Sequence, residues 1–307
     1  SVHSMSLFDE HDIELFDRLH DHRKLPIRVH ASYPLQQWET LVHRVKEKGH
    51  GDQWLQVRML KGFADGSLGS RTAAMLAPYT DEPENDGLLL RPAPEMYELM
   101  HKAYLHNLQV AVHAIGDRAI RSLLDNLAAI IRQEGRRDHR FRIEHAQHIH
   151  PDELPRFAKL DAIASMQPIH LRYDGRWFHR ALGNERLPQA YPLRALADNH
   201  TQLAFGSDWF VAPPNPFAGM AMAVTRNLGT KEMPQAFHPG QALSIDEAID
   251  AYTIGPAYAA FEEHRKGKLE KGFLADFIVL NQDLTRIAPE AIENTRVIRT
   301  FVNGEEV

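Results

Sequence analysis

The sequence predicts an α/β fold, a (β/α)8 TIM-type barrel whose first βα unit is missing, and three observations support this. Short apolar runs rich in β-branched residues alternate with amphipathic segments along most of the 307 residues, which is typical of βα units around a buried parallel sheet. Polar residues end several of these runs, as they do around the rim of a parallel barrel. The main rival, a doubly wound open sheet, usually carries a glycine-rich phosphate-binding turn after its first strand, and this sequence has none.

Seven runs are predicted to be strands. The first, at 1–5, resembles the end of a strand because no turn leads into it, so we expect the missing βα unit to lie before Ser1. The other strands are expected at 27–31, 55–63, 109–114, 140–145, 162–166 and 202–206. Helices are expected between them at 12–24, 35–48, 95–105, 118–133, 151–159 and 193–199; in the first, Ile13, Leu15, Phe16 and Leu19 share a helical face.

The pattern changes after Ser244. A longer helix is expected at 245–261, with Ser244 as its N-cap and Glu247 in the capping-box position. Strands are expected at 275–280 and 297–302, and Asn303-Gly304 is a strong signal for a two-residue hairpin. We therefore divide the chain into a barrel domain at 1–262 and a small β domain at 263–307.

Composition excludes several classes of function. The net charge is −6 and the basic residues are scattered, so there is no electrostatic footprint for nucleic acid. The absence of cysteine excludes disulfides, thiolate catalysis and cysteine-based zinc sites. No apolar run approaches the length of about 20 residues that spans a bilayer, and no signal peptide opens the chain. We expect a cytoplasmic protein that does not bind membranes.

Two histidines and one aspartate at predicted strand ends are candidate metal ligands. His113 and His145 end consecutive strands, so both imidazoles can reach one cation, and neutral imidazole is a common zinc ligand. A single strand-end histidine is more often a hydrogen-bonded core residue, but the pair favours a metal. Asp208 follows the last barrel strand, either as a turn aspartate or as a carboxylate that contacts the metal and takes the proton of its bound water.

Lys61 is a fourth strand-end residue with two possible roles. As an ammonium group with a pKa near 10.4 it repels a metal, and it would pair with Asp65 or another carboxylate. It becomes a ligand only if its amine is carboxylated, which turns a cation into a bridging anion. No local feature of the sequence indicates that modification.

Three residues are candidate substrate contacts. Arg71 closes a Gly/Ser-rich loop at 65–71 and could bind a substrate carboxylate. Gln167 ends the strand at 162–166 on the same rim, and Trp209 could line a pocket wall next to Asp208. Each has an ordinary structural interpretation as well, in a turn, in loop hydrogen bonding or in stiffening a loop.

At these residues the chain resembles the amidohydrolase superfamily, and in particular its YtcJ-like branch, which includes N-substituted formamide deformylases. The resemblance covers essentially the whole chain. It rests on several blocks in the right order: 61–73 (KGFADGSLGSRTA), 113–117 (HAIGD), 143–147 (IEHAQ), 206–209 (GSDW), 251–253 (AYT) and 267–276 (GKLEKGFLAD).

The resemblance implies a metal-dependent hydrolase that cleaves a C–N bond, built on a distorted (β/α)8 barrel beside a small β-sandwich. By position, Lys61 would be the carboxylated bridging ligand, His113 and His145 metal ligands, and Asp208 the ligand and general base. One or two divalent ions, usually zinc, would activate the attacking water.

The sequence departs from the family pattern in one respect. The family's first strand ends in a His-x-His pair that holds one metal, and no such pair stands at a suitable position here, since His148-Ile-His150 comes too late. We therefore expect an incomplete metal set in this chain, and poor turnover.

Two other functions stay open at this stage. The chain could be a non-catalytic fragment that keeps the barrel scaffold, or a hydrolase of an ester, lactone or phosphotriester, because a fold supports many chemistries. The expected partner is a small-molecule substrate that the sequence does not identify, and an open side of the barrel would favour a homo-oligomer.

Overall fold

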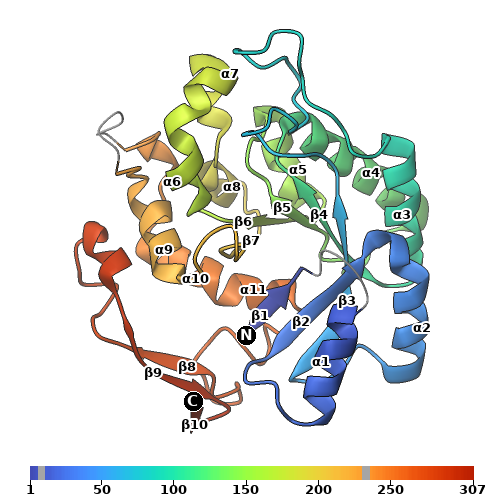
Figure 1. Cartoon of the computed structure of the whole chain (residues 1–307), viewed down its shortest axis with the longest axis vertical. Coiled ribbons are helices and arrows are strands. Elements are labelled where there is room, and N and C mark those ends of the chain that lie inside the picture. Colours follow the sequence, from blue (N-terminus) through green and yellow to red (C-terminus); the bar gives the residue numbers. More distant parts are fainter. Residues whose placement is uncertain (6–10, 230–235) are drawn as a thin grey trace.

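The computed structural model of the protein describes residues 1–5, 11–229 and 236–307. Seven parallel strands form one curled sheet, hydrogen-bonded in the order β1 to β7, with helices around it (Figure 1). Neighbours in the chain are neighbours in the sheet, so all seven carboxyl ends lie at one rim. The predicted seven-stranded parallel sheet is confirmed. Within the described residues, β1 and β7 form its two edges.

The element bounds follow the predicted alternation. The strands of the curled sheet are β1 (Val2–Ser4), β2 (Val29–Pro34), β3 (Leu55–Phe63), β4 (Gln109–Ala114), β5 (Arg142–His145), β6 (Ile163–Met166) and β7 (Leu203–Phe205). The helices are α1 (His11–Asp21), α2 (Trp38–Lys48), α3 (Ala93–Leu105), α4 (Asp117–Glu134), α5 (Leu154–Lys159), α6 (His170–Asp174), α7 (Phe178–Arg186), α8 (Leu193–Asp198), α9 (Pro216–Thr225), α10 (Ile245–Tyr252) and α11 (Ile254–Ala259).

The sheet curls far enough for side chains of distant strands to meet inside it. Arg142 on β5 donates to Ser165 Oγ on β6 at 2.9 Å, and its guanidinium also lies 2.9 Å from the His3 ring nitrogen on β1. Apart from the edge strand β1, the strands are mostly buried; every residue of β6 and all but one of β2 and β4 are buried. Burial on both faces explains why these strands read as continuous apolar runs in the sequence.

The β7 edge is closely covered by α11. A Cβ on Gly255 would lie 2.0 Å from the carbonyl oxygen of Leu203, so the helix can approach the strand only because this residue is glycine. Pro256 then stands in the first turn of α11, where its missing N–H costs nothing.

The carboxyl-terminal residues form a separate antiparallel sheet of β8 (Phe277–Leu280), β9 (Val297–Val302) and β10 (Glu305–Glu306). Asn303 and Gly304 connect β9 to β10 with φ values of 55° and 82°, which confirms the predicted hairpin. A bidentate ion pair ties this sheet to the larger one, since Asp276 accepts from the buried Arg28 guanidinium at 2.6 and 2.9 Å.

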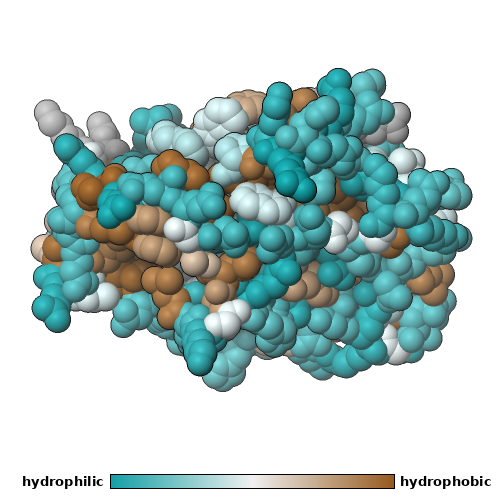
Figure 2. All heavy atoms as spheres, turned by 90° about the horizontal axis from the view of Figure 1, so that it is seen from below, coloured by the Kyte–Doolittle hydropathy of each residue, from teal (hydrophilic) through white to brown (hydrophobic). Residues whose placement is uncertain are grey.

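The small sheet leaves apolar side chains exposed. In Figure 2 hydrophobic residues gather at the left of the face seen from below, where Figure 1 places this sheet. The exposed apolar side chains of β8 and β9 are Ile278, Val279, Val297 and Ile298.

Four helical segments differ from the sequence prediction. The single helix expected at 245–261 is two helices, because Thr253 leaves helical geometry at φ −126° and ψ −72° just before Gly255-Pro256. The expected capping box of Ser244 and Glu247 is present. Helices α6, α7 and α9 were not predicted; α6 has only five residues, and Gly183 lies inside α7 at φ 65°.

In the part of the chain that the structure describes, no helix combines the length and the apolar character that crossing a membrane requires.

Candidate metal centre

The four strand-end residues singled out in the sequence lie at one rim of the curled sheet. Lys61 is near the end of β3, His113 near the end of β4, His145 ends β5, and Asp208 follows β7. The register of the parallel strands places these residues at similar heights along the strand direction, since Phe63 pairs with His113 and His113 pairs with Glu144. Residues spread over nearly half of the sequence therefore meet at the same edge.

The His113 ring has a defined tautomer. Its Nε2 lies 2.9 Å from the carbonyl oxygen of Gly66, and since a carbonyl can only accept, Nε2 carries the proton. The other nitrogen, Nδ1, is then left with a lone pair. Burial, with a further contribution from the charge of Lys61, lowers the pKa of His113 to about 4, so the ring is neutral at physiological pH.

His145 lies against His113. The two ring centroids are 4.4 Å apart in an edge-to-face arrangement. Nδ1 of His145 is buried, and it has no hydrogen-bond partner among the described residues. Burial holds the pKa of His145 well below its usual value, with the His113 and Lys61 charges acting in the same direction. An unpartnered buried imidazole nitrogen costs free energy unless something binds it.

A third histidine, His170, joins this group and was missed in the sequence. His145, His170 and Asp208 each offer one ligand atom, and these three atoms lie within 4.8 Å of one another. His170 opens α6, four residues beyond the end of β6, so it did not read as a strand-end residue. Its Nε2 lies 3.1 Å from the carbonyl oxygen of Ser207, next to Asp208, and burial lowers its pKa.

Lys61 and Asp208 complete the charges at the rim. The Lys61 side chain is buried; its Nζ donates to the Gly62 carbonyl at 3.0 Å and lies 3.7 Å from the centroid of the Phe63 ring. Burial lowers the pKa of Lys61 to about 8 against the opposing charges of Glu144 and Asp208. Burial raises the pKa of Asp208, opposed by the His170 and Lys61 charges.

The backbone at the rim is held in unusual conformations. His145, Ala146 and Asp208 have φ values of 71°, 45° and 55°, in the left-handed region that residues other than glycine rarely occupy. Such conformations are typical of functional sites, where the surrounding structure enforces them.

Asp65 organises the neighbouring loop rather than pairing with Lys61. Its carboxylate accepts backbone N–H groups from Ala74, Ile115 and Gly116 at 2.8 to 3.0 Å. One of its oxygens is also 3.6 Å from His113 Nε2. Asp65 therefore joins the loop after β3 to the turn after β4 and helps to hold His113.

The three predicted substrate contacts occupy different environments. The guanidinium of Arg71 pairs with both oxygens of Asp81 and lies 5.3 Å from the centroid of the Trp177 ring. Gln167 is buried and hydrogen-bonds the Ser165 carbonyl at 3.3 Å. Trp209 is 70% exposed immediately after Asp208. Their roles toward a substrate stay predictions.

The donor set fits a divalent cation. The imidazoles of His113, His145 and His170 are neutral and offer nitrogen, and Asp208 offers oxygen, which is the ligand chemistry of zinc and related ions. The unpartnered Nδ1 of His145 is the atom that a cation would most directly satisfy.

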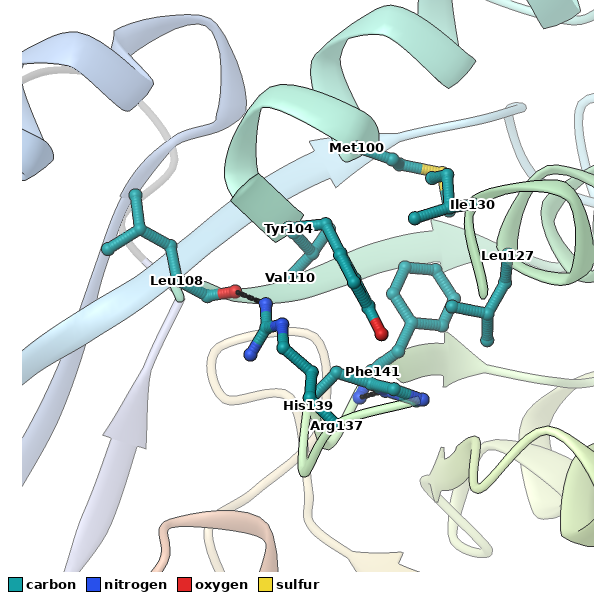
Figure 3. Close-up of a pocket in the computed structure, with 9 residues that line it drawn as sticks. All are labelled: Met100, Tyr104, Leu108, Val110, Leu127, Ile130, Arg137, His139 and Phe141. Atoms are coloured by element: carbon teal, nitrogen blue, oxygen red, sulfur yellow. Dashed lines mark hydrogen bonds between the residues drawn. The ribbon is translucent and has the colours of Figure 1, made fainter. Parts of the chain in front are cut away.

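An apolar cavity of about 10 Å³ lies at the other end of the strands and is distinct from this centre (Figure 3). That volume holds about one water molecule. Its lining residues come from α3, α4 and the residues that begin β4 and precede β5: Met100, Tyr104, Leu108, Val110, Leu127, Ile130, Arg137, His139 and Phe141.

Comparison with known proteins shows clear relatives. A family model described as "Amidohydrolase family" matches residues 5–307. The chain is 36% identical over 287 residues to "Protein LONG AFTER FAR-RED 3" of Arabidopsis thaliana, a match that covers 93% of this chain and 49% of that protein. It is 31% identical to "Putative amidohydrolase YtcJ" of Bacillus subtilis (strain 168), covering 92% of this chain and 53% of that protein.

The chain thus spans about half the length of these curated relatives. Among solved structures, an uncharacterized metal-dependent hydrolase from Pyrococcus horikoshii OT3 has a TM-score of 0.82 at 32% identity. That match covers 94% of this chain and 57% of the other.

Proposed function

The chain belongs to the amidohydrolase family, and we propose that it forms the catalytic part of a metal-dependent hydrolase that cleaves a non-peptide C–N bond of the amide or formamide type. The bond class is supported by the similarity to a putative amidohydrolase and by the sequence blocks that resemble formamide deformylases.

One observation carries the proposal. Neutral imidazoles and a carboxylate meet at the carboxyl rim of the sheet, with His113 and His145 in ring contact and His145 close to Asp208. Active sites of parallel barrels lie at this rim, because loops after different strands converge there.

The proposed roles follow from the position of each side chain. Lys61, His113, His145 and Asp208 would hold one or two divalent ions, zinc being the first candidate. A bound ion supplies Lewis-acid activation of a water molecule. Asp208 would accept the proton of the attacking water and deliver it to the leaving nitrogen; its raised pKa suits a group that must both take up and release a proton.

Lys61 would act as a carboxylated ligand. Its pKa of about 8 leaves a larger neutral fraction than an ordinary lysine has, and the neutral amine is the form that adds to carbon dioxide. The carbamate would be an anion close to His113 and His145. A mass increase of one carbon dioxide on the peptide containing Lys61 would test this.

Arg71, Gln167 and Trp209 are proposed to contact the substrate. Trp209 offers an exposed aromatic surface beside Asp208, and Arg71 offers a guanidinium that its ion pair with Asp81 already orients. The bound substrate is proposed to be a small molecule.

The described sheet is proposed to correspond to strands 2–8 of an eight-stranded barrel, with the barrel domain at 1–262 and part of a small β-sandwich at 263–307. Among the described residues β1 and β7 do not pair with each other, and the relatives are longer than this chain, which supports this proposal. Self-association through the open side stays a prediction.

The direct test has two measurements. Plasma emission gives the metal content of the chain, and an activity assay follows the hydrolysis of N-formyl and N-acyl amines by the zinc-loaded chain. We expect zinc in the wild-type chain, release of formate or another acid, and loss of both in His113→Ala and His145→Ala. Release of acid only from esters or lactones would overturn the C–N assignment. Unchanged metal content in both variants would overturn the metal centre.

A further inference from the structure

We propose that His170 is a further metal ligand, so that His145, His170 and Asp208 bind one divalent cation between them. This inference rests on the proposed function, because it places the ion more narrowly within the same rim. His170 has no role in the ligand set that the sequence resemblance implies.

The distances suit a shared ion. The candidate ligand atoms of the three residues lie within 4.8 Å of one another. Two ligands bonded at about 2.1 Å to one tetrahedral zinc ion are about 3.4 Å apart, so a pair at the 4.8 Å limit would have to close by about 1.4 Å. Small side-chain rotations achieve a contraction of that size.

The hydrogen bonding of His170 leaves one ring nitrogen free to bind a metal. Its Nε2 lies 3.1 Å from the Ser207 carbonyl oxygen, which can only accept, so Nε2 is protonated and Nδ1 keeps its lone pair. Metal-bound histidines nearly always donate their second ring nitrogen to a carbonyl or carboxylate in this way. His113 has the same arrangement with the Gly66 carbonyl at 2.9 Å.

The fold delivers the three ligands from adjacent elements. His145 ends β5, His170 follows β6, and Asp208 follows β7, and these strands are consecutive neighbours in the sheet. The bond from His170 to Ser207 also fixes the residue that precedes Asp208. Two ligands are thus oriented by one hydrogen bond.

The donor set is that of a catalytic rather than a structural site. Two imidazoles and one carboxylate leave the fourth position of a tetrahedral zinc ion open for water or substrate. Asp208 is exposed to solvent, so that open position can be reached from outside. The site would therefore be able to present a water molecule at the rim.

The competing explanation is that His170 only braces the loop at Ser207. The variant His170→Gln separates the two, because the glutamine amide nitrogen reaches the position of Nε2 and can donate to the Ser207 carbonyl but is a poor zinc ligand. His170→Ala removes both functions. His179→Ala is the matched control, because His179 is exposed on the nearby α7.

The experiment uses the full chain, stripped of metal with a chelator and titrated with Zn²⁺ against a competing dye, and with Co²⁺ to record its visible spectrum. Circular dichroism confirms that each variant is folded. We expect both His170 variants to bind Zn²⁺ more than about 100-fold more weakly than the wild type, beyond the effect of losing an outer hydrogen-bond partner. The Co²⁺ spectrum should change in both, and His179→Ala should match the wild type.

X-ray absorption of the wild-type chain provides a readout that needs no variant. One equivalent of Zn²⁺ should be bound by at least two imidazoles, and His170→Gln, if folded, should lose one of them. Retention of wild-type affinity and spectrum in folded His170→Gln, with loss in His145→Ala, would overturn the role of His170 and leave the hydrolase proposal standing. Failure of the wild-type chain to bind any Zn²⁺ would overturn both.

Discussion

The two ends of the parallel strands differ in what some of their buried charged and polar side chains contact. At the amino end, Arg140 pairs with Asp138 at 3.0 Å and with Glu263 at 2.7 Å, and Arg28 pairs with Asp276 at 2.6 Å. At the carboxyl end, polar atoms of His145 and Lys61 have few partners. Nδ1 of His145 has no hydrogen-bond partner in the described ranges, and Lys61 Nζ contacts a backbone carbonyl and an aromatic ring.

This contrast separates stability from function. A buried charge or lone pair without a partner costs free energy, so a fold under selection for stability alone would satisfy it. The ion pairs of Arg28 and Arg140 do so at the amino end, and they join the sheet to the segments that follow α11. At the carboxyl end, Nδ1 of His145 stays without a partner among the described residues, which is expected where a ligand completes the bonding. Unpaired buried atoms occur at the amino end as well: Nε of Arg58, whose guanidinium lies 3.5 Å from the centroid of the Phe261 ring, Nε2 of His139 and Oε1 of Gln109.

The largest effect is expected at the carboxyl end, in Asp208→Asn. Loss of the proposed general base should lower the hydrolysis rate of the metal-loaded chain by about 10²–10⁴-fold. The melting temperature should change little, because Asp208 is exposed. Rate assays and thermal melts of the same preparations measure both, and a variant that keeps its rate would remove Asp208 from the mechanism.

At the amino end, Arg140→Ala should cost stability and leave the metal content unchanged. Arg140 is 7% exposed, and its loss leaves Asp138 and Glu263 without their partner. Asp138 and Glu263 are 57% and 19% exposed and regain water when Arg140 is removed, so we expect a loss of about 3 kcal/mol of unfolding free energy, the upper end of the range for hydrogen bonds to charged groups, measured by urea denaturation.

Arg136→Ala is the control for that variant. Its ion pair with Asp161 is more than half exposed on both sides, so the expected loss is below about 1 kcal/mol. Equal losses in the two variants would show that burial does not set the strength of amino-end pairs.

The connection between the two sheets should be weaker than the Arg140 pair but measurable. Asp276→Asn removes the counter-charge of the buried Arg28 while keeping the shape of the side chain. We expect a loss of about 1.5–3 kcal/mol, the range for hydrogen bonds to charged groups, together with faster proteolysis near β8. An unchanged urea midpoint would mean that apolar packing alone holds the small sheet.

The smallest effect concerns pH at the amino end. Burial, then the charge of Arg137, lowers the pKa of His139 to about 4, whereas an unfolded histidine titrates near 6.5. Between these values the unfolded state binds more protons, so stability should fall as pH falls, by up to about 1.4 kcal/mol per pH unit.

His139→Asn tests that slope, because it removes the titration and keeps an acceptor for the N–H of Phe141, which now donates to His139 Nδ1 at 3.0 Å. Unfolding free energies measured at pH 7, 6 and 5 should fall less steeply in the variant. Parallel curves would show that His139 keeps an ordinary pKa in the folded chain.

Much of the fold and part of the site were predictable from local sequence. Strands β2 to β7 are mostly buried and therefore appear as apolar runs, and the hairpin at Asn303-Gly304 and the capping box at Ser244 depend on a few adjacent residues. His113 and His145 could be predicted as neighbours, because parallel strands bring consecutive carboxyl ends together.

Other features were decided only by tertiary structure. His170 reaches the rim because α6 begins just beyond β6 and turns the ring toward Ser207, which no spacing in the sequence shows. Asp65 is held by backbone groups of two distant loops instead of Lys61, and Arg71 is paired with Asp81. The physical reason is the separation of the residues along the sequence. Strand burial and turn preferences depend on residues that are close in sequence, whereas proximity at the rim depends on how far the whole sheet curls.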